Sequence, residues 1–105
     1  MNLKQKVLEI LITNAVAIMP GASVLPTRLL AKFLKASQND VRKCLKELVT
    51  EGLVQYGYEG GWNEYSERPY CTWGYYITQK ARDLPEYKEA ERREHEYIVK
   101  SLRRN

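Results

Sequence analysis

The chain is poor in the residues that enzymes most often place at an active site. Its 105 residues include one histidine and two cysteines. No glycine-rich phosphate loop precedes a predicted helix, and no nucleophile is paired with a base. Cys44 and Cys71 lie far apart and match no metal-ligand spacing. We therefore expect no catalysis, no metal and no cofactor, with both cysteines reduced and structural and His95 on the surface.

The chain also lacks internal repeats, low-complexity segments and any apolar run long enough to span a membrane. In the N-terminal region two lysines precede an apolar run from Val7 to Met19, as in a signal peptide. Glu9, Thr13 and Asn14 interrupt that run at positions that keep helical spacing for the apolar residues. We interpret the segment Leu3–Ala17 as an amphipathic core helix, and expect a cytoplasmic protein.

Length and composition indicate one soluble globular domain covering residues 1–105. Hydrophobic residues make up 44% of the chain and charged residues 29%. A net charge of +4 and a pI of about 9.1 favour a polyanionic partner. Eight tyrosines and two tryptophans stand against one phenylalanine, and such amphipathic rings are typical of surfaces and interfaces.

The most informative stretch runs from Ser37 to Val54. Its apolar residues recur at i, i+4, i+7 and i+8, which is one face of an α-helix: Val41, Leu45, Leu48 and Val49. Ser37 can cap the N-terminus of this helix, with Asp40 three residues later as in a capping box, and Gly52 is suited to end it. The pattern predicts a helix over residues 38–51.

Opposite the apolar stripe, the same helix carries a polar and basic face: Asn39, Arg42, Lys43, Lys46 and Thr50. Its acids Asp40, Glu47 and Glu51 gather on one flank. A basic face uninterrupted by negative charge is typical of a DNA recognition helix, although a solvated lysine-rich face is the alternative.

The segments before this helix complete a helix-turn-helix. Met19-Pro20-Gly21 is a turn signal, and Pro26 holds Leu25 in an extended conformation. Thr27 is then predicted to cap a helix from Arg28 to Leu34. Its residues Leu30, Ala31, Phe33 and Leu34 are expected to face inward, and Lys35-Ala36-Ser37 forms the turn.

The segments after this helix predict a β-hairpin and two further helices. Strands are expected over Leu53–Tyr58 and Tyr70–Ile77, separated by a break at residues 59–61 and a long polar-aromatic loop, Trp62–Pro69. Thr78 is predicted to cap a short helix, Gln79–Leu84. Pro85 then begins a helix that runs to about Leu102. We thus divide the chain into a core with its hairpin, residues 1–84, and a C-terminal helix, residues 85–103.

This order of elements resembles the winged helix-turn-helix domain of bacterial transcription regulators of the MarR and PadR kind. The matching segments are residues 30–34, residues 37–54 and residues 76–81, where Ala81 replaces the usual glycine. The resemblance implies an α+β, mostly α fold with a three-helix core, a β-hairpin wing and a C-terminal helix. It further implies transcription regulation by a bacterial or phage-like protein. The wing departs from the family, since it is long and carries Glu59, Glu64 and Glu67 against one arginine.

The leading functional prediction is therefore sequence-specific binding of double-stranded DNA. Gln38 and Asn39 suit adenine, and Arg42 suits guanine. The other expected contacts are to phosphates or to the helix start: Thr27, Arg28, Lys32, Ser37, Lys43, Lys46 and, on the wing, Arg68. The alternative is a protein-interaction module that uses the aromatic, acidic wing.

Two further expectations concern assembly. A homodimer is predicted to form through the C-terminal helix, with Tyr87, Tyr97, Ile98 and Leu102 as its seam; the alternative is that this helix only covers the first one. The loop from Glu59 to Tyr70 is expected to fold back on its own domain or to meet a protein partner, with at most Arg68 touching DNA. The alternative for this loop is a disordered tip with Trp62 exposed.

Overall fold

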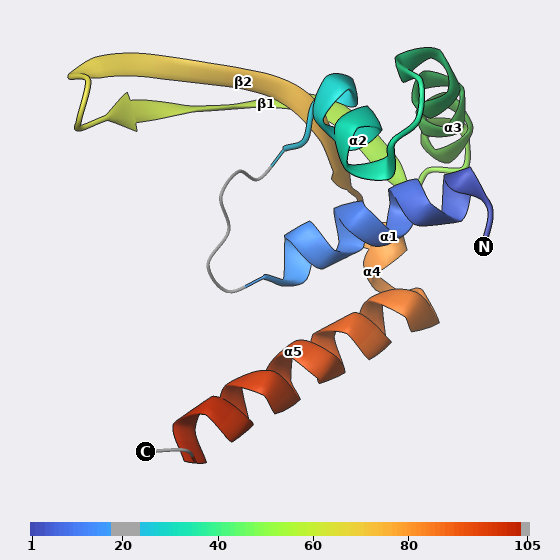
Figure 1. Cartoon of the computed structure of the whole chain (residues 1–105), viewed down its shortest axis with the longest axis vertical. Coiled ribbons are helices and arrows are strands. Elements are labelled where there is room, and N and C mark those ends of the chain that lie inside the picture. Colours follow the sequence, from blue (N-terminus) through green and yellow to red (C-terminus); the bar gives the residue numbers. More distant parts are fainter. Residues whose placement is uncertain (18–23, 104–105) are drawn as a thin grey trace.

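The computed structural model describes residues 1–17 and 24–103. Its elements in chain order are α1 (Leu3–Val16), α2 (Thr27–Leu34), α3 (Gln38–Thr50), β1 (Val54–Asn63), β2 (Arg68–Ile77), α4 (Gln79–Arg82) and α5 (Pro85–Arg103) (Figure 1). The predicted α+β architecture, with a helical core, a β-hairpin and a C-terminal helix, is confirmed. The turn predicted at Met19-Pro20-Gly21 lies outside the described residues.

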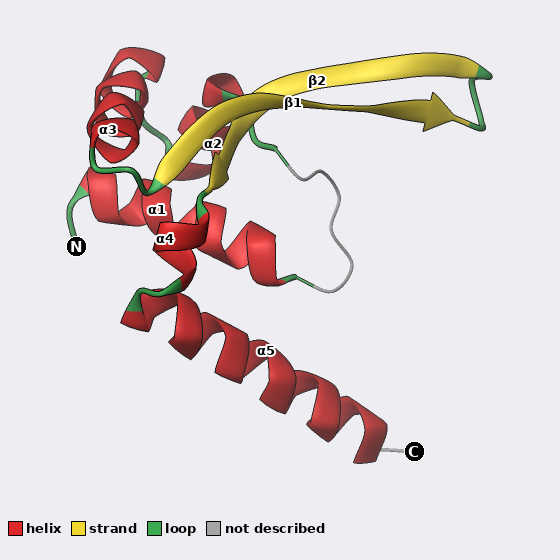
Figure 2. Cartoon of the chain, turned by 180° about the vertical axis from the view of Figure 1, so that it is seen from behind, coloured by secondary structure: helices red, strands yellow, loops and turns green. Residues whose placement is uncertain are grey.

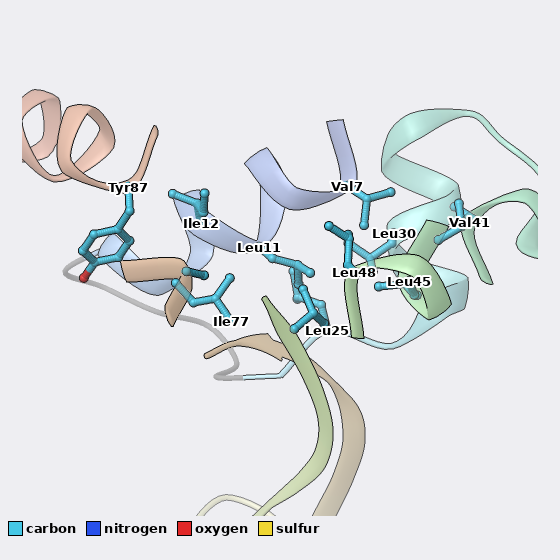
Figure 3. Close-up of a cluster of buried hydrophobic side chains, with 13 residues drawn as sticks. Val7, Leu11, Ile12, Leu25, Leu30, Val41, Leu45, Leu48, Ile77 and Tyr87 are labelled. Carbon is cyan, nitrogen blue, oxygen red and sulfur yellow. The ribbon is translucent and has the colours of Figure 1, made fainter. Parts of the chain in front are cut away.

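The core forms where α1 lies against α2 and α3. Asn2 caps the N-terminus of α1 in a reciprocal capping box. Its side-chain oxygen accepts from the Gln5 N–H, and its own N–H donates to the Gln5 side-chain oxygen. One buried cluster then collects the apolar stripes of the three helices (Figure 3), including Val7, Leu11, Leu30, Val41, Leu45 and Leu48. Burial of these side chains is the main source of the domain's stability.

Three details of the predicted helices are wrong. Thr27 is the first residue of α2 and not its cap; Pro26 occupies the cap position, with no side-chain hydrogen bond. Phe33 was expected to face inward but is 59% exposed, because α2 buries the face that carries Leu30 and Ala31, and Phe33 lies outside that face. Val49 is also exposed, at the edge of the stripe on α3.

The hairpin is longer and more regular than the sequence suggested. β1 and β2 pair antiparallel from Val54 with Ile77 out to Asn63 with Arg68. The break predicted at residues 59–61 is therefore wrong, because Gly60 and Gly61 remain paired, with Cys71 and Tyr70 respectively. Only residues 64–67 remain outside the strands, so the long loop predicted at Trp62–Pro69 is wrong as well.

A short bridge ties the hairpin to the segment before α2. Leu25 and Tyr75 exchange backbone hydrogen bonds of 3.0 and 2.8 Å, which confirms the extended conformation predicted for Leu25. The bridge brings the Leu25 backbone against Gly74, where an added Cβ would lie 2.6 Å from the Leu25 carbonyl carbon. The bridge can therefore form only with glycine at position 74, because any side chain there would overlap the Leu25 backbone.

The turn at the tip of the hairpin is stabilised by the side chain of Asn63. The Asn63 side-chain oxygen accepts hydrogen bonds from the N–H groups of Tyr65 and Ser66, at 2.9 and 3.2 Å. Glu67 adopts a left-handed conformation, with φ of 54°. Both views show the hairpin reaching away from the helices (Figures 1 and 2). The expectation that residues 59–70 fold back on the domain is therefore wrong.

The C-terminal helices follow the predictions closely. Thr78 caps α4 by accepting from the Ala81 N–H, and Pro85 begins α5. The first half of α5 lies against α1, where Tyr87 is buried in the common core and Ala90 packs beside it. The other half of α5 continues beyond the core to Arg103 (Figure 2).

Candidate nucleic-acid interface

Helix α3 is fixed at both ends. At its N-terminus the Ser37 hydroxyl accepts from the Asp40 N–H at 3.1 Å, as predicted. At its C-terminus Gly52 takes the left-handed conformation, with φ of 77°, and the Leu53 N–H donates to the Leu48 carbonyl at 3.0 Å. The helix therefore presents its outer face in a defined orientation.

The outer face of α3 is the polar and basic face expected from the sequence. It is solvent-exposed along its whole length: Gln38, Asn39, Arg42, Lys43, Lys46 and Thr50. The Arg42 guanidinium donates to the Asn39 side-chain oxygen at 3.0 Å. The two residues thereby hold each other in place one turn apart, next to the helix start. The Thr50 hydroxyl is occupied, since it donates to the Lys46 carbonyl.

Two of the three acids of α3, Glu47 and Glu51, lie beside α1. Lys4 of α1 pairs with Glu51 and lies 3.9 Å from Glu47. The hydrogen bond with Glu51 raises the pKa of Lys4. The one positive charge of Lys4 offsets one of these two negative charges, and the sequence alone did not reveal this contact.

Two residues after the wing support the C-terminal end of α3. The Lys80 ammonium donates to the Glu51 carbonyl at 2.9 Å, and the Thr78 hydroxyl donates to the Gly52 carbonyl at 2.6 Å. Both groups satisfy carbonyls that a helix end leaves without partners. Sequence reasoning missed this role, because it depends on the return of the chain after β2 to the C-terminal end of α3.

The other residues expected to touch DNA lie on different elements. Arg28 and Lys32 are exposed on α2, and Thr27 is half-buried at its first turn. Ser37 uses its oxygen as the cap, so only its hydroxyl proton is available to a phosphate. Arg68 is exposed at the start of β2, near the hairpin tip. Thus the α2 and α3 residues belong to the adjacent helices of the motif, while Arg68 is remote from them.

The four residues predicted for the dimer seam on α5 differ in their exposure to solvent. Tyr87 is 8% exposed, and its hydroxyl accepts from Arg82 at 3.0 Å. Its ring belongs to the core of its own chain, so we remove it from the proposed seam. Tyr97 and Leu102 are 68% and 69% exposed, and Ile98 is half-buried.

Beside these residues, α1 and α5 enclose an open groove of about 790 Å³. Its apolar lining comes from Leu8, Ile12, Val16, Ala90 and Tyr97.

No metal-binding cluster of histidine, cysteine and acidic residues occurs within residues 1–17 and 24–103. His95 is exposed on α5. Cys44 is half-buried beside the core, and burial raises the pKa of its thiol, while Cys71 is exposed on β2. Across the same residues, no helix is both long enough and apolar enough to cross a membrane.

Comparison with known proteins supports the fold. No protein-family model matches the chain, and no curated protein matches it. Its structure is similar to that of the adhesin competence repressor AdcR from Streptococcus pyogenes, with a TM-score of 0.52 and 23% identity, over 98% of this chain and 63% of that one. A cysteine-to-serine variant of Lactococcus lactis ZitR gives a TM-score of 0.46 and 24% identity, over 95% of this chain and 57% of that one.

The chain thus spans about three fifths of the length of AdcR. At this identity the similarity shows the fold alone: the chain is a winged helix-turn-helix, as the sequence predicted. In this fold α2 and α3 are the helix-turn-helix and the β1–β2 hairpin is the wing.

Proposed function

We propose that the chain is a transcription regulator that binds double-stranded DNA in a sequence-specific manner, with the recognition helix, residues 38–51, in the major groove. The observation that carries this proposal is the exposed, acid-free basic face of α3. In a helix-turn-helix the N-terminal residues of the second helix contact base edges. Here those residues are Gln38, Asn39 and Arg42.

The side chains divide into base contacts and phosphate contacts. Gln38 and Asn39 suit the paired donor and acceptor of adenine, and Arg42 suits the two acceptors of guanine. Lys43 and Lys46, together with Thr27, Arg28, Lys32 and Ser37, are suited to phosphates on either side of the groove. To contact a base edge, Arg42 would give up its hydrogen bond to the Asn39 side-chain oxygen.

The fold comparison supports the same class of function. AdcR is named a repressor, and this chain shares its fold over most of the chain's length. Since bacterial chromosomal DNA lies in the cytoplasm, we place the proposed regulator there.

The test begins with DNA selected from a random pool by the full chain, followed by fluorescence anisotropy at several salt concentrations. A variant with alanine at Asn39, Arg42, Lys43 and Lys46 should lose binding. Its matched control carries alanine at Lys6, Lys88 and Lys100, which removes the same three charges from exposed sites elsewhere. If the first variant stayed folded and bound like the wild type, the proposed recognition helix would be wrong.

Single substitutions separate the two kinds of contact. Arg42→Ala should cost about 1–3 kcal/mol and relax the preference at one base pair. Lys46→Ala should weaken binding to all DNA sequences alike and reduce the slope of log K against log salt concentration by about 1. Equal effects of both variants on every sequence would contradict base reading by Arg42.

We also propose that the regulator is a homodimer, since one such domain covers a short stretch of DNA and a two-fold dimer reads a palindrome. The exposed Tyr97 and Leu102, the half-buried Ile98 and the adjoining α1–α5 groove support a seam there. These residues lie on the half of α5 that its own core leaves uncovered.

A further inference from the structure

The wing has two different faces, and the strand register defines them. In an antiparallel pair, directly opposed residues share a face, and successive residues alternate between faces. One face, which we call the aromatic face, consists of Tyr56 with Tyr75, Tyr58 with Trp73, Gly60 with Cys71, and Trp62 with Pro69. The strand residues Glu59 and Arg68 both fall on the opposite face. The aromatic face therefore carries no charge.

Four rings of the aromatic face, nearest the core, form a ladder of ring contacts. Tyr56 and Trp73 are stacked, with ring centroids 5.6 Å apart and planes 21° apart. Tyr58 lies 5.1 Å from Trp73, and Tyr56 lies 4.9 Å from Tyr75. The ladder begins where Val54 and Ile77 enter the core. Its base is thus anchored on buried residues.

These rings nevertheless remain open to solvent. Trp62 is 61% exposed and Trp73 is 52% exposed, and Tyr56 and Tyr58 are exposed as well. A contiguous run of large exposed rings is unusual on a free surface and marks an interaction site. Gly60 and Cys71 carry no large side chain, and this pair separates the Trp73 and Trp62 rungs of the ladder.

Charge at the wing tip restricts what can bind there. Glu64 and Glu67 lie in the turn at the end of the ladder. These carboxylates would repel the phosphates of a nucleic acid, and they would repel each other if the wings of two copies packed together. They favour a cationic partner, and electron-rich tryptophan and tyrosine rings also attract arginine.

We propose that the aromatic face of the wing binds an extended segment of another protein, rich in proline and arginine. Proline rings pack on aromatic ladders, and a polyproline helix loses little conformational entropy on binding. Arginine can stack on Trp62 or Trp73 and pair with Glu64 or Glu67. This surface shares no residue with the basic face of α3, so the proposal does not depend on DNA binding.

The chain carries its own reporter for this test, because Trp62 and Trp73 are its two tryptophans. The full chain is titrated with an Arg-Pro-Pro repeat peptide, and tryptophan fluorescence is recorded. A saturable change is expected. Trp73→Ser should weaken binding by roughly tenfold, as loss of an interface anchor does, with Trp62 as the remaining reporter. The matched control is Tyr70→Ser on the opposite face, which should bind as the wild type does.

A second variant keeps the rings and removes the charge. The double variant Glu64→Gln with Glu67→Gln should bind the peptide more weakly, and its affinity should depend less on salt concentration. Circular dichroism should show an unchanged fold. The proposal is overturned if no saturable change occurs up to millimolar peptide, or if a Glu-Pro-Pro repeat binds equally well. It is equally overturned if oligothymidylate binds through Trp73 instead, or if Trp73→Ser acts only by abolishing self-association.

Discussion

At Gly74 the wing leaves no room for a side chain. An added Cβ would lie 2.6–2.9 Å from three backbone atoms of Leu25, whose own bridge to Tyr75 prevents retreat. Gly74→Ala should therefore destabilise the domain by about 1–3 kcal/mol, as overpacking does, measured by urea unfolding. Gly57 is the matched control, since it pairs with Gly74 and the atoms nearest to its added Cβ belong to the exposed side chain of Tyr76 and not to the backbone. Equal losses in both variants would contradict this explanation.

The two cysteines differ at the same scale. Burial raises the pKa of the Cys44 thiol, so less of it is thiolate at a given pH, and its side chain is half-covered by the core. Iodoacetamide at mildly alkaline pH should therefore alkylate the exposed Cys71 first, and the Cys44 rate should rise further as the pH increases. Mass spectrometry of the adducts measures both rates, with Cys71→Ser as the control. Equally fast modification of Cys44 would show that α3 opens readily.

At the scale of the element, the wing departs from the usual pattern of a DNA-binding hairpin. It carries Glu59, Glu64 and Glu67, and Arg68 is its one cation. We expect at most Arg68 to touch the duplex. Glutamine at the three glutamates should then leave DNA affinity and its salt dependence unchanged in anisotropy measurements. Tighter, more salt-sensitive binding that requires Arg68 would show that the wing lies on the DNA.

At the scale of the whole molecule, α5 is shared between the core and the proposed dimer. Removing the helix would also remove the buried Tyr87, so truncation cannot separate these roles. Tyr97→Glu with Leu102→Glu should instead give a folded monomer, because charge disfavours an apolar seam. Light scattering and circular dichroism measure mass and fold. The matched control is Lys100→Glu with Arg103→Glu, which changes the other side of the last turns of α5 and should remain dimeric. If the variant with Tyr97→Glu and Leu102→Glu were still a dimer, the proposed seam would be wrong.

The order and type of the elements could be predicted from the sequence, because apolar periodicity and capping residues act locally. The stripe Val41, Leu45 and Leu48, the cap at Ser37 and the stop at Gly52 each depend on neighbours within one or two turns. The basic face of α3 could be predicted for the same reason, since helical geometry alone places its side chains.

Features that depend on contacts between distant segments could not be predicted from the sequence. The pairing of Gly60 and Gly61 within the ladder, the exposure of Phe33 and the burial of Tyr87 follow from which elements meet. The same holds for Lys4, which draws Glu47 and Glu51 toward α1. The aromatic face of the wing also belongs here, because strand register, which long-range pairing sets, decides which rings share a face.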